Sequence, residues 1–223
     1  QERASEEGFE LQFVDLGGGD IQNRLIAEQS NPIAHVTFGM NNVYFETLKD
    51  AGVLADYTPS WEGEVDESLG DGEQFWPIVR EPIILVYNDG AYSEEKAPSD
   101  WEDLWEEEEF HGRYETPTSL GGATTQLVVT GILSRYLDEN GELGVSDEGW
   151  DAIEEFFANG SPAVQGTDLY ARMASGDVDM GQMWLAGKDS REEEYGISTA
   201  AVHPSAGVPM ATQHVGLVAG SEE

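Results

Sequence analysis

The chain has 223 residues, of which 39% are hydrophobic, so it can bury a core as one large domain or as two small lobes. Ten lysines and arginines stand against 45 aspartates and glutamates, which gives a formal net charge of −35. An acidic surface of this kind repels nucleic acid and anionic lipid, and the composition therefore excludes both as partners. The absence of cysteine excludes disulfides and thiolate metal sites in this chain.

The same acidic charge leads us to predict a halophilic protein, adapted to high salt. Runs such as residues 106–109 and 192–194 are typical of solvated faces. Repulsion between such carboxylates lowers stability at low ionic strength, and added salt screens it. We therefore expect the melting temperature, followed by circular dichroism at fixed pH, to rise between dilute buffer and molar NaCl. A melting temperature that stays constant or falls would contradict this prediction.

Strand-like and helix-like segments alternate along the chain. Strands are predicted at residues 12–16, 33–38, 78–88, 178–184, 197–202 and 214–218. Helices are predicted after the cap Asp20, at residues 43–50, after a capping box at Ser99, after residue 122, around residues 150–157 and at residues 167–175. This alternation predicts an α/β protein with largely parallel sheets.

The region between residues 122 and 150 contains the end of a predicted helix and a possible calcium-binding loop. The helix after residue 122 is predicted to carry Leu137 on its apolar face and to end at Asn140-Gly141. Residues 138–149 resemble the start of a calcium loop, but Leu143 and Gly149 stand where that loop needs glycine and glutamate. We interpret this segment as an acidic turn between two helices.

The sequence indicates no catalytic residue, no metal site and no cofactor. Its four histidines are far apart and match no H-E-x-x-H spacing, and no G-x-S-x-G elbow is present. Structural roles are therefore predicted for the histidines. Carboxylate pairs carry little information in a chain as acidic as this one.

Several short stretches follow one another in a characteristic order. They are LIAEQSNPIAHV at 25–36, LKDAGVL at 48–54, YN at 87–88, APSDWEDL at 97–104, FHGR at 110–113, PTS at 117–119 and SGDVDMG at 175–181. In order and spacing these stretches resemble the extracellular solute-binding proteins of ABC importers for ferric iron, thiamine, polyamines and 2-aminoethylphosphonate. The resemblance covers nearly the whole chain, but that family has further segments at both ends, so we expect the given sequence to be incomplete at both termini.

The resemblance implies the type II periplasmic-binding-protein fold, in which two α/β lobes close on a ligand. Residues 1–86 and 205–223 would form part of one lobe and residues 87–204 the other, with crossover strands near 78–88 and 197–218. The implied function is to bind a small molecule and deliver it to a membrane permease, without enzyme activity. A hydrolase or lyase on a similar scaffold is the alternative from another class.

The resemblance also implies where the protein acts and in what state. An extracytoplasmic location is expected, in the periplasm or at the cell surface. A lipoprotein anchor would have to lie on a segment outside this chain. We expect the protein to act as a monomer.

The first candidate for ligand binding is the loop with Gly39, Met40 and Asn41. It follows a predicted strand, at the end where open α/β sheets bind ligands. The alternative is a structural role in which Asn42 caps the next helix.

A second candidate loop contains Ser119, Gly122, Thr124 and Thr125. It offers hydroxyl groups and free backbone N–H groups at the start of a helix, which suits phosphate, phosphonate or carboxylate. Simple capping by Thr118 or Ser119 is the alternative.

Trp184 and Arg80 complete the candidate set. The Trp184 indole could stack on a ring or hold an ammonium group, and a buried core tryptophan is the alternative. Arg80 lies in the predicted crossover strand and could meet an anion, although a surface or ion-paired arginine is the more common outcome.

The ligand class follows partly from the resemblance. Ferric-binding members supply two adjacent tyrosines where this chain has Met183-Trp184-Leu185, and Met40 stands near the position of an expected acidic ligand, so ferric iron is disfavoured. We favour a phosphonate, a phosphate ester or another small organic anion. A cation such as thiamine or a polyamine is the alternative, because the acidic surface suits it.

Overall fold

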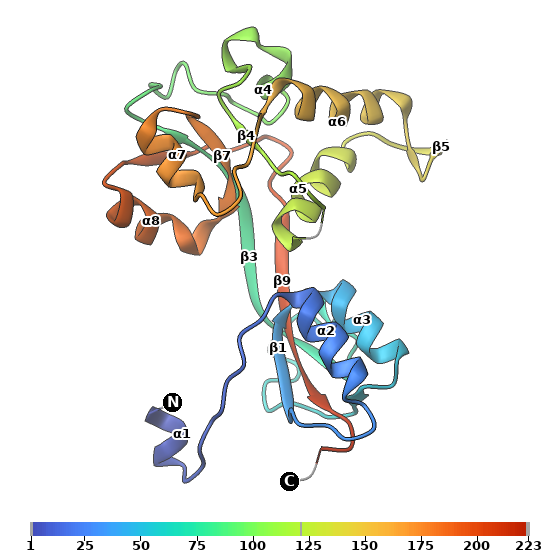
Figure 1. Cartoon of the computed structure of the whole chain (residues 1–223). Helices are drawn as coiled ribbons and strands as arrows, with labels where there is room; N and C mark the ends of the chain where they lie inside the picture. The colour runs from blue at the N-terminus through green and yellow to red at the C-terminus, as the bar shows by residue number, and fades with distance from the viewer. Residues whose placement is uncertain (1, 121, 222–223) are drawn as a thin grey trace. The chain divides into compact units, whose positions relative to one another are not determined.

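The computed structural model describes residues 2–120 and 122–221. It divides into two compact units, one that runs up to Ile78 and resumes at Gln213, and one formed by Val79–Thr212 (Figure 1). The division falls inside strands β3 (Phe75–Asn88) and β9 (Met210–Val218), so both strands contribute to both units. The lobe limits predicted at residues 86–87 and 204–205 remain a prediction. Within the described residues, no helix is long and apolar enough to cross a membrane.

The first unit is a small antiparallel sheet covered by two helices. Besides parts of β3 and β9, it contains α1 (Glu2–Glu6), α2 (Gly18–Ala27), β1 (Val36–Met40), α3 (Asn42–Asp50), β2 (Leu54–Ala55) and the 3-10 turn η1 (Glu67–Leu69). Strands β1 and β2 both pair antiparallel with β9. Helices α2 and α3 lie side by side and enclose a core that includes Leu25, Phe45, Leu48 and Phe75 (Figure 1).

The strand predicted at residues 12–16 is wrong. This segment has no regular secondary structure, and Phe13 and Val14 are exposed. Phe13 contacts Phe38 edge to face, with 6.4 Å between the ring centroids. Alternation of apolar residues gives a strand only where a neighbouring strand supplies hydrogen-bond partners, and the described part of the chain supplies none here.

Asp71 organises the loop that leads into β3. Its Oδ1 accepts hydrogen bonds from the backbone N–H groups of Glu73, Gln74 and Phe75 at 3.0, 2.8 and 2.9 Å, and its Oδ2 pairs with Lys49 at 2.9 Å. Burial alone raises the pKa of Asp71, but the backbone donors and Lys49 outweigh burial and lower it. Asp71 is therefore held as a carboxylate in the folded unit.

Asp71→Asn should cost about 1.5–3 kcal/mol of unfolding free energy near pH 7, because the variant loses the charge that Lys49 and the N–H groups stabilise. A carboxyl group with a lowered pKa stabilises the fold above its unfolded pKa, and this contribution is lost as pH falls through the folded pKa. The difference from wild type should therefore shrink below about pH 4. Urea unfolding at several pH values measures it, with exposed Asp50→Asn as a near-neutral control. A difference that is independent of pH would contradict this assignment.

The second unit is built around the central part of β3. Its elements after β3 are α4 (Asp103–Glu106), η2 (Glu108–Phe110), β4 (Glu115–Thr116), α5 (Ala123–Leu133), β5 (Leu137–Glu142), α6 (Asp147–Asn159), β6 (Ser161–Pro162), α7 (Leu169–Ser175), β7 (Met180–Trp184), η3 (Leu185–Gly187), α8 (Lys188–Tyr195) and β8 (Thr199–Ala201). Strands β7 and β8 pair antiparallel with β3, whereas β4 and β6 pair parallel with each other. The expectation of largely parallel sheets is therefore wrong. Alternation of strands and helices along the sequence does not determine whether β3 runs parallel or antiparallel to the strands that pair with it.

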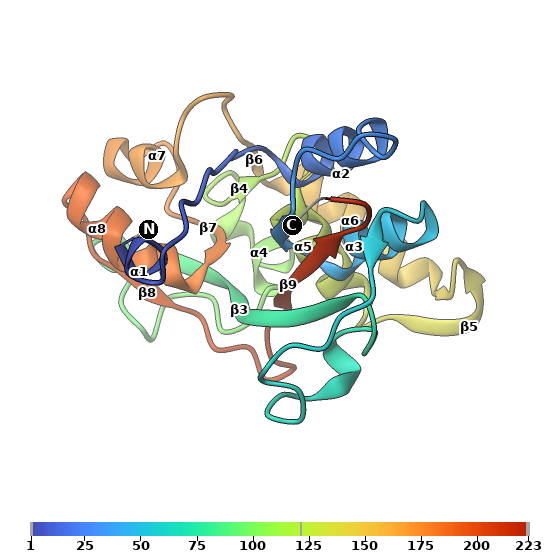
Figure 2. The same ribbon diagram turned by 90° about the horizontal axis from the view of Figure 1, so that it is seen from below.

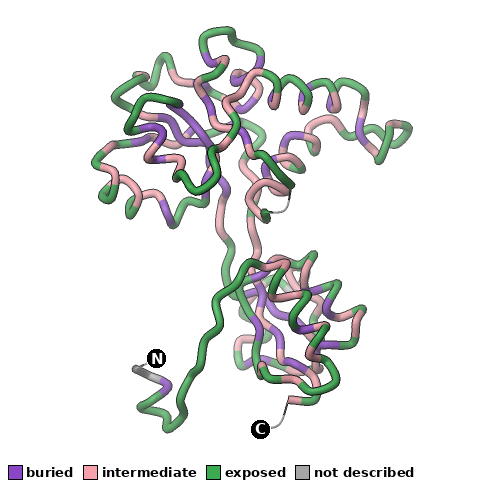
Figure 3. The backbone as a smooth tube through the Cα atoms, in the orientation of Figure 1, coloured by how far each residue is buried: buried purple, intermediate pink, exposed green. Residues whose placement is uncertain are grey.

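The two faces of β3 bury two different clusters in the second unit. Leu85 and Tyr87 face a cluster with Trp101, Tyr114 and Phe156, and the alternate residues of the strand, Ile84 and Val86, face a cluster with Tyr170, Met173 and Val178. This is the two-residue period of a strand that is covered on both sides. Figure 3 shows β3 and β7 as largely buried in this unit.

The helix predicted to end at Asn140-Gly141 ends at Leu133 instead. Leu137 is 75% exposed and begins β5, which doubles back through a hydrogen bond from Asp138 N to Gly144 O at 3.0 Å. Leu143 adopts a positive φ of 53°, and Gly144 follows it with 81°. The acidic segment is thus a short hairpin, not a simple turn between helices.

The capping box predicted at Ser99 is also wrong. Helix α4 begins at Asp103, and the N–H and Oγ of Ser99 donate to Asp103 Oδ2 at 2.7 and 2.9 Å. The serine therefore donates to a carboxylate and does not accept from the helix.

Candidate ligand-binding site

Three strand ends meet at one edge of the second unit. Strand β4 pairs parallel with β6, and Tyr114, just before β4, bridges Met180 of β7 in the parallel sense. The parallel pairing places the carboxyl ends of β6, β4 and β7 at the same edge, followed by residues 163–168, 117–120 with 122, and 185–187. Figure 2 labels the three strands near one another. Open α/β sheets bind ligands outside such strand ends, which makes this edge the candidate site.

The loop after β4 brings Ser119, Gly122, Thr124 and Thr125 to this edge. Ser119 and Gly122 are exposed, and the two threonines are half-buried in the first turn of α5. Gly122 occupies the N-cap position, and among the described residues no side chain caps the helix there. The alternative of capping by Thr118 or Ser119 is therefore wrong, and the polar groups at this helix start stay available. Gly121, in the same loop, lies outside the described residues.

Trp184 ends β7 at the same edge, and it is not a buried core residue. It is 40% exposed, and a Cβ added at Gly187 would lie 2.6 Å from its indole Nε1. Glycine at position 187 is therefore required for the indole to lie where it does. The Cζ atom of Arg191 lies over the indole, 5.6 Å from the ring centroid, which is within range of a cation–π interaction.

Arg191 connects Trp184 to a second loop of the edge. Its Nε forms an ion pair with Asp168 Oδ2 at 2.8 Å, and Asp168 ends the segment that follows β6. The Asp168 side chain also accepts from Tyr170 N and so caps α7. Sequence reasoning missed Arg191 and Asp168, because nothing in the spacing of residues 168, 184 and 191 indicates that they meet.

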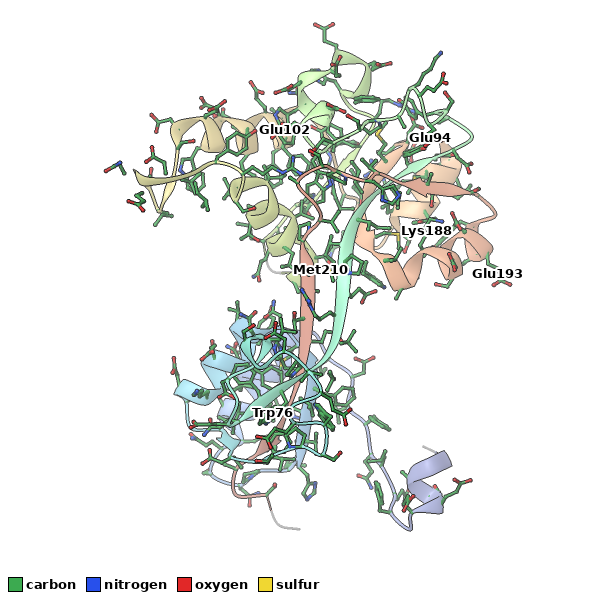
Figure 4. The ribbon with its side chains drawn as sticks, turned by 180° about the vertical axis from the view of Figure 1, so that it is seen from behind. Trp76, Glu94, Glu102, Lys188, Glu193 and Met210 are labelled. Carbon is green, nitrogen blue, oxygen red and sulfur yellow. The ribbon has the colours of Figure 1, made fainter. Side chains whose placement is uncertain are left out.

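The carboxylate of Glu192 is engaged elsewhere on α8. Burial alone raises the pKa of Glu192, but bonds from Lys188 at 2.8 Å and from Thr199 outweigh burial and lower it. Figure 4 labels Lys188 and Glu193 on this helix. Glu192 thus pairs with Lys188, whereas the neighbouring Arg191 pairs with Asp168.

Arg80 is exposed on β3 and makes no ion pair among the described residues. Arg80 lies three residues before Ile83 on β3, and Ile83 pairs with Trp184 between β3 and β7. The next residue, Glu81, accepts a hydrogen bond from Ala186 N at 2.8 Å and so joins β3 to the loop after Trp184. Arg80 therefore lies on the strand that borders the candidate edge.

The remaining candidates, Gly39, Met40 and Asn41, belong to the first unit. Gly39 has a φ of 90° and forms a bulge between Phe38 and Met40, a conformation that favours glycine. Met40 is 3% exposed and packs in the core. Asn41 Oδ1 accepts from Tyr44 N at 3.3 Å, so Asn41, not the predicted Asn42, caps α3.

The described residues contain no cluster of three or more histidine, aspartate or glutamate side chains that could hold a metal ion. The candidate edge instead combines hydroxyl groups, a helix start, an exposed indole and an arginine. Such groups suit an organic solute with a charged end.

Comparison with solved structures defines the class of fold. The chain superposes on iron-bound HitA from Pseudomonas aeruginosa with a TM-score of 0.81 and 18% identity, over 99% of this chain and 70% of that one. It also superposes on a periplasmic thiamin binding protein with a TM-score of 0.74 and 18% identity, over 99% of this chain and 67% of that one. The superposition on AfuA from Actinobacillus pleuropneumoniae with bound fructose-6-phosphate has a TM-score of 0.74 and 17% identity, over 99% of this chain and 69% of that one. The predicted type II periplasmic-binding-protein fold is therefore confirmed.

Comparison of sequences then gives the family. Residues 2–222 match the model of the bacterial extracellular solute-binding proteins, and the chain belongs to this family. It is 32% identical over 226 residues to "Probable ABC transporter periplasmic-binding protein y4fP" of Sinorhizobium fredii, a match that covers all of this chain and 61% of that protein. The chain thus spans less than two thirds of the length of this relative. The matched family and its relatives are solute-binding proteins, not enzymes.

Proposed function

We propose that this chain is the substrate-binding component of an ABC importer, which captures a small solute outside the cytoplasm for a membrane permease. The observation that carries the proposal is the family match over residues 2–222, together with the relative whose name places it in an ABC transporter. The similar structures include an iron-bound protein, a thiamin binding protein and a protein with bound fructose-6-phosphate, so the fold alone does not select the solute.

The proposed solute is a small organic anion such as a phosphonate or a phosphate ester. The uncapped start of α5 and the hydroxyl groups of Ser119, Thr124 and Thr125 support it, because backbone N–H groups at a helix start favour anions. Arg80 adds a cation without an ion-pair partner in the described part of the chain. A net charge of −35 cannot steer anions over long distances, so these local donors would supply the affinity.

Two other solute classes, organic cations and ferric iron, are included in the binding screen described below. A cation such as thiamine or a polyamine would use the exposed indole of Trp184 and the surrounding carboxylates. Ferric iron would need hard oxygen ligands, and Met183-Trp184-Leu185 offers none at the end of β7. The contribution of Gly39, Met40 and Asn41 remains a prediction, since Met40 is buried and Asn41 is engaged in a cap.

A thermal-shift screen tests the proposal. The panel contains 2-aminoethylphosphonate, inorganic phosphate, glucose 6-phosphate, thiamine, spermidine and ferric citrate. A solute present at 100 times its Kd should add about 2.7 kcal/mol of stability, which is roughly 5–10 °C in melting temperature for a chain of this size. We expect an anion of the panel to give this shift, and a panel in which no solute stabilises the chain would contradict solute binding.

Replacing Thr124 and Thr125 together with valine should abolish anion binding and spare cation binding, because the change removes hydroxyl donors while keeping the side-chain shape. Isothermal titration calorimetry measures it. Thr130→Val on the same helix is the matched control, since its hydroxyl donates within the helix to Gln126 O at 2.7 Å. A double variant that binds the anion with full affinity would show that the start of α5 is not the anion site.

A further inference from the structure

The guanidinium of Arg191 contacts both a carboxylate and an aromatic ring. Its Nε is paired with Asp168 at 2.8 Å, its Cζ lies 5.6 Å from the centroid of the Trp184 ring, and its side chain remains 29% exposed. Within the part of the chain that the structure describes, no acceptor is bonded to its two terminal nitrogens. The guanidinium is thus held by an ion pair through Nε and by the indole, and its terminal nitrogens make no hydrogen bond to another described residue.

We propose that Arg191 is the anion-recognising residue of the solute site, with Trp184 as the residue that positions it. This inference rests on the proposed function and specifies its chemistry. The terminal N–H groups form a planar fork that matches two oxygens of a phosphonate, phosphate or carboxylate group. Arg191 covers one face of the Trp184 indole, so this face cannot also bind the ammonium group of a cationic solute.

The position of Arg191 in the fold supports this role. Helix α8 begins directly after η3, at the carboxyl end of β7, and Asp168 closes the segment after β6. Arg191 therefore joins two of the three loops at the edge where strands β6, β4 and β7 end. The third of these loops leads into α5, which lies beside β7, with Thr124 and Thr125 in its first turn.

The local contacts also lower the cost of binding. A free arginine loses much side-chain entropy when it binds a ligand, but Arg191 is already restrained by the indole and by Asp168. Gly187 is part of the same arrangement, since any larger residue would meet the indole Nε1 at 2.6 Å and displace it. In a chain with 45 acidic residues, a restrained cation of this kind offers an anion a local counter-charge.

Calorimetric titration of the full chain with 2-aminoethylphosphonate, inorganic phosphate and spermidine tests the proposal. We expect Arg191→Gln to weaken binding of the phosphonate roughly 10- to 100-fold, the loss of a hydrogen bond to a charged group. Arg191→Lys should retain part of the affinity, because it keeps the charge without the planar fork. Arg24→Gln is the control, an exposed arginine paired with Glu28 on α2, and it should bind as wild type does.

Trp184 needs a separate readout, because it would act through Arg191. Trp184→Leu should weaken phosphonate binding about 2- to 5-fold, and Trp184→Phe should restore most of the loss, since any aromatic face can hold the guanidinium. Equal losses in Trp184→Leu and Trp184→Phe would contradict the positioning role.

Four outcomes overturn the assignment of Arg191. Wild-type affinity of Arg191→Gln for the phosphonate leaves the proposed function standing and removes Arg191 from the site. Preferential binding of spermidine that strengthens in Arg191→Gln shows a cation site. Absence of binding of all three probes to wild type overturns the anion assignment for the chain as a whole, and solute capture then depends on the wider thermal-shift panel. If Arg191→Gln fails to fold, equal phosphonate affinity of Arg191→Lys and wild type overturns the proposal.

Discussion

Replacing Phe156 with alanine is expected to destabilise the second unit by about 3–5 kcal/mol, the cost of emptying a closely packed aromatic site. Phe156 is 0% exposed and lies at the centre of an aromatic group on α6 and its neighbours. Its ring stacks on Tyr114 with 5.5 Å between the centroids and meets Trp105 and Phe157 edge to face at 6.1 and 5.2 Å. Because three of these rings pack around one side chain, the cavity cannot close by the movement of one residue.

Urea unfolding followed by tryptophan fluorescence and circular dichroism measures this loss. Leu137→Ala in the same unit is the matched control, because Leu137 is also apolar but 75% exposed, and it should change stability by less than about 0.5 kcal/mol. Similar losses in the two variants would show that the core of this unit does not lie around α6.

The second large effect is expected for Arg172→Met, which removes a buried cation. Arg172 is 5% exposed, and its Nη1 donates to Glu115 Oε2 at 2.7 Å and to Pro162 O at 3.1 Å, while Nη2 donates to Ser161 Oγ at 2.7 Å. The arginine thus ties α7 to both β4 and β6. Removing one member of a buried ion pair costs about 3–5 kcal/mol, because the other charge is left uncompensated.

Glu115 provides the internal check on this loss. Burial raises the pKa of Glu115 and Arg172 opposes the rise, so Arg172→Met should raise this pKa further. The folded variant then binds a proton more readily than the unfolded chain, and its stability should increase as pH falls from 7 towards 5. In Arg172→Met/Glu115→Gln the loss should be smaller than in Arg172→Met alone, whereas Arg24→Met at an exposed pair should be nearly neutral. A single variant as stable as wild type, or a double variant with the full loss, would contradict the role of the pair.

Local signals in the sequence predicted much of the fold. Helix α3 was expected at residues 43–50 and spans Asn42–Asp50, and the glycine after α7, Gly176, has a left-handed φ of 80° as a C-cap. The apolar run at residues 78–88 lies in β3, and the resemblance to solute-binding proteins predicted the fold that the comparisons confirm. These features depend on neighbours in sequence, or on the order of short motifs along the chain.

The failures have a common physical cause, which is dependence on partners distant in sequence. Residues 12–16 have the pattern of a strand but no strand beside them in the described structure, and Leu137 is apolar but lies in an exposed hairpin. At the candidate site, Trp184 was identified because the family resemblance places it where ferric-binding members have tyrosines, but its contact with Arg191 was not predicted. That contact depends on the ion pair with Asp168, which follows a different strand.

Calorimetric titration combined with recovery of the solute tests the central claim most directly. The solute that gives the largest thermal shift is titrated into the purified chain, and the solute is then analysed by mass spectrometry after prolonged incubation. We expect saturable binding of one molecule of an anionic solute per chain, with the solute recovered unchanged. Absence of stoichiometric binding, or conversion of the bound solute into a product, would contradict it.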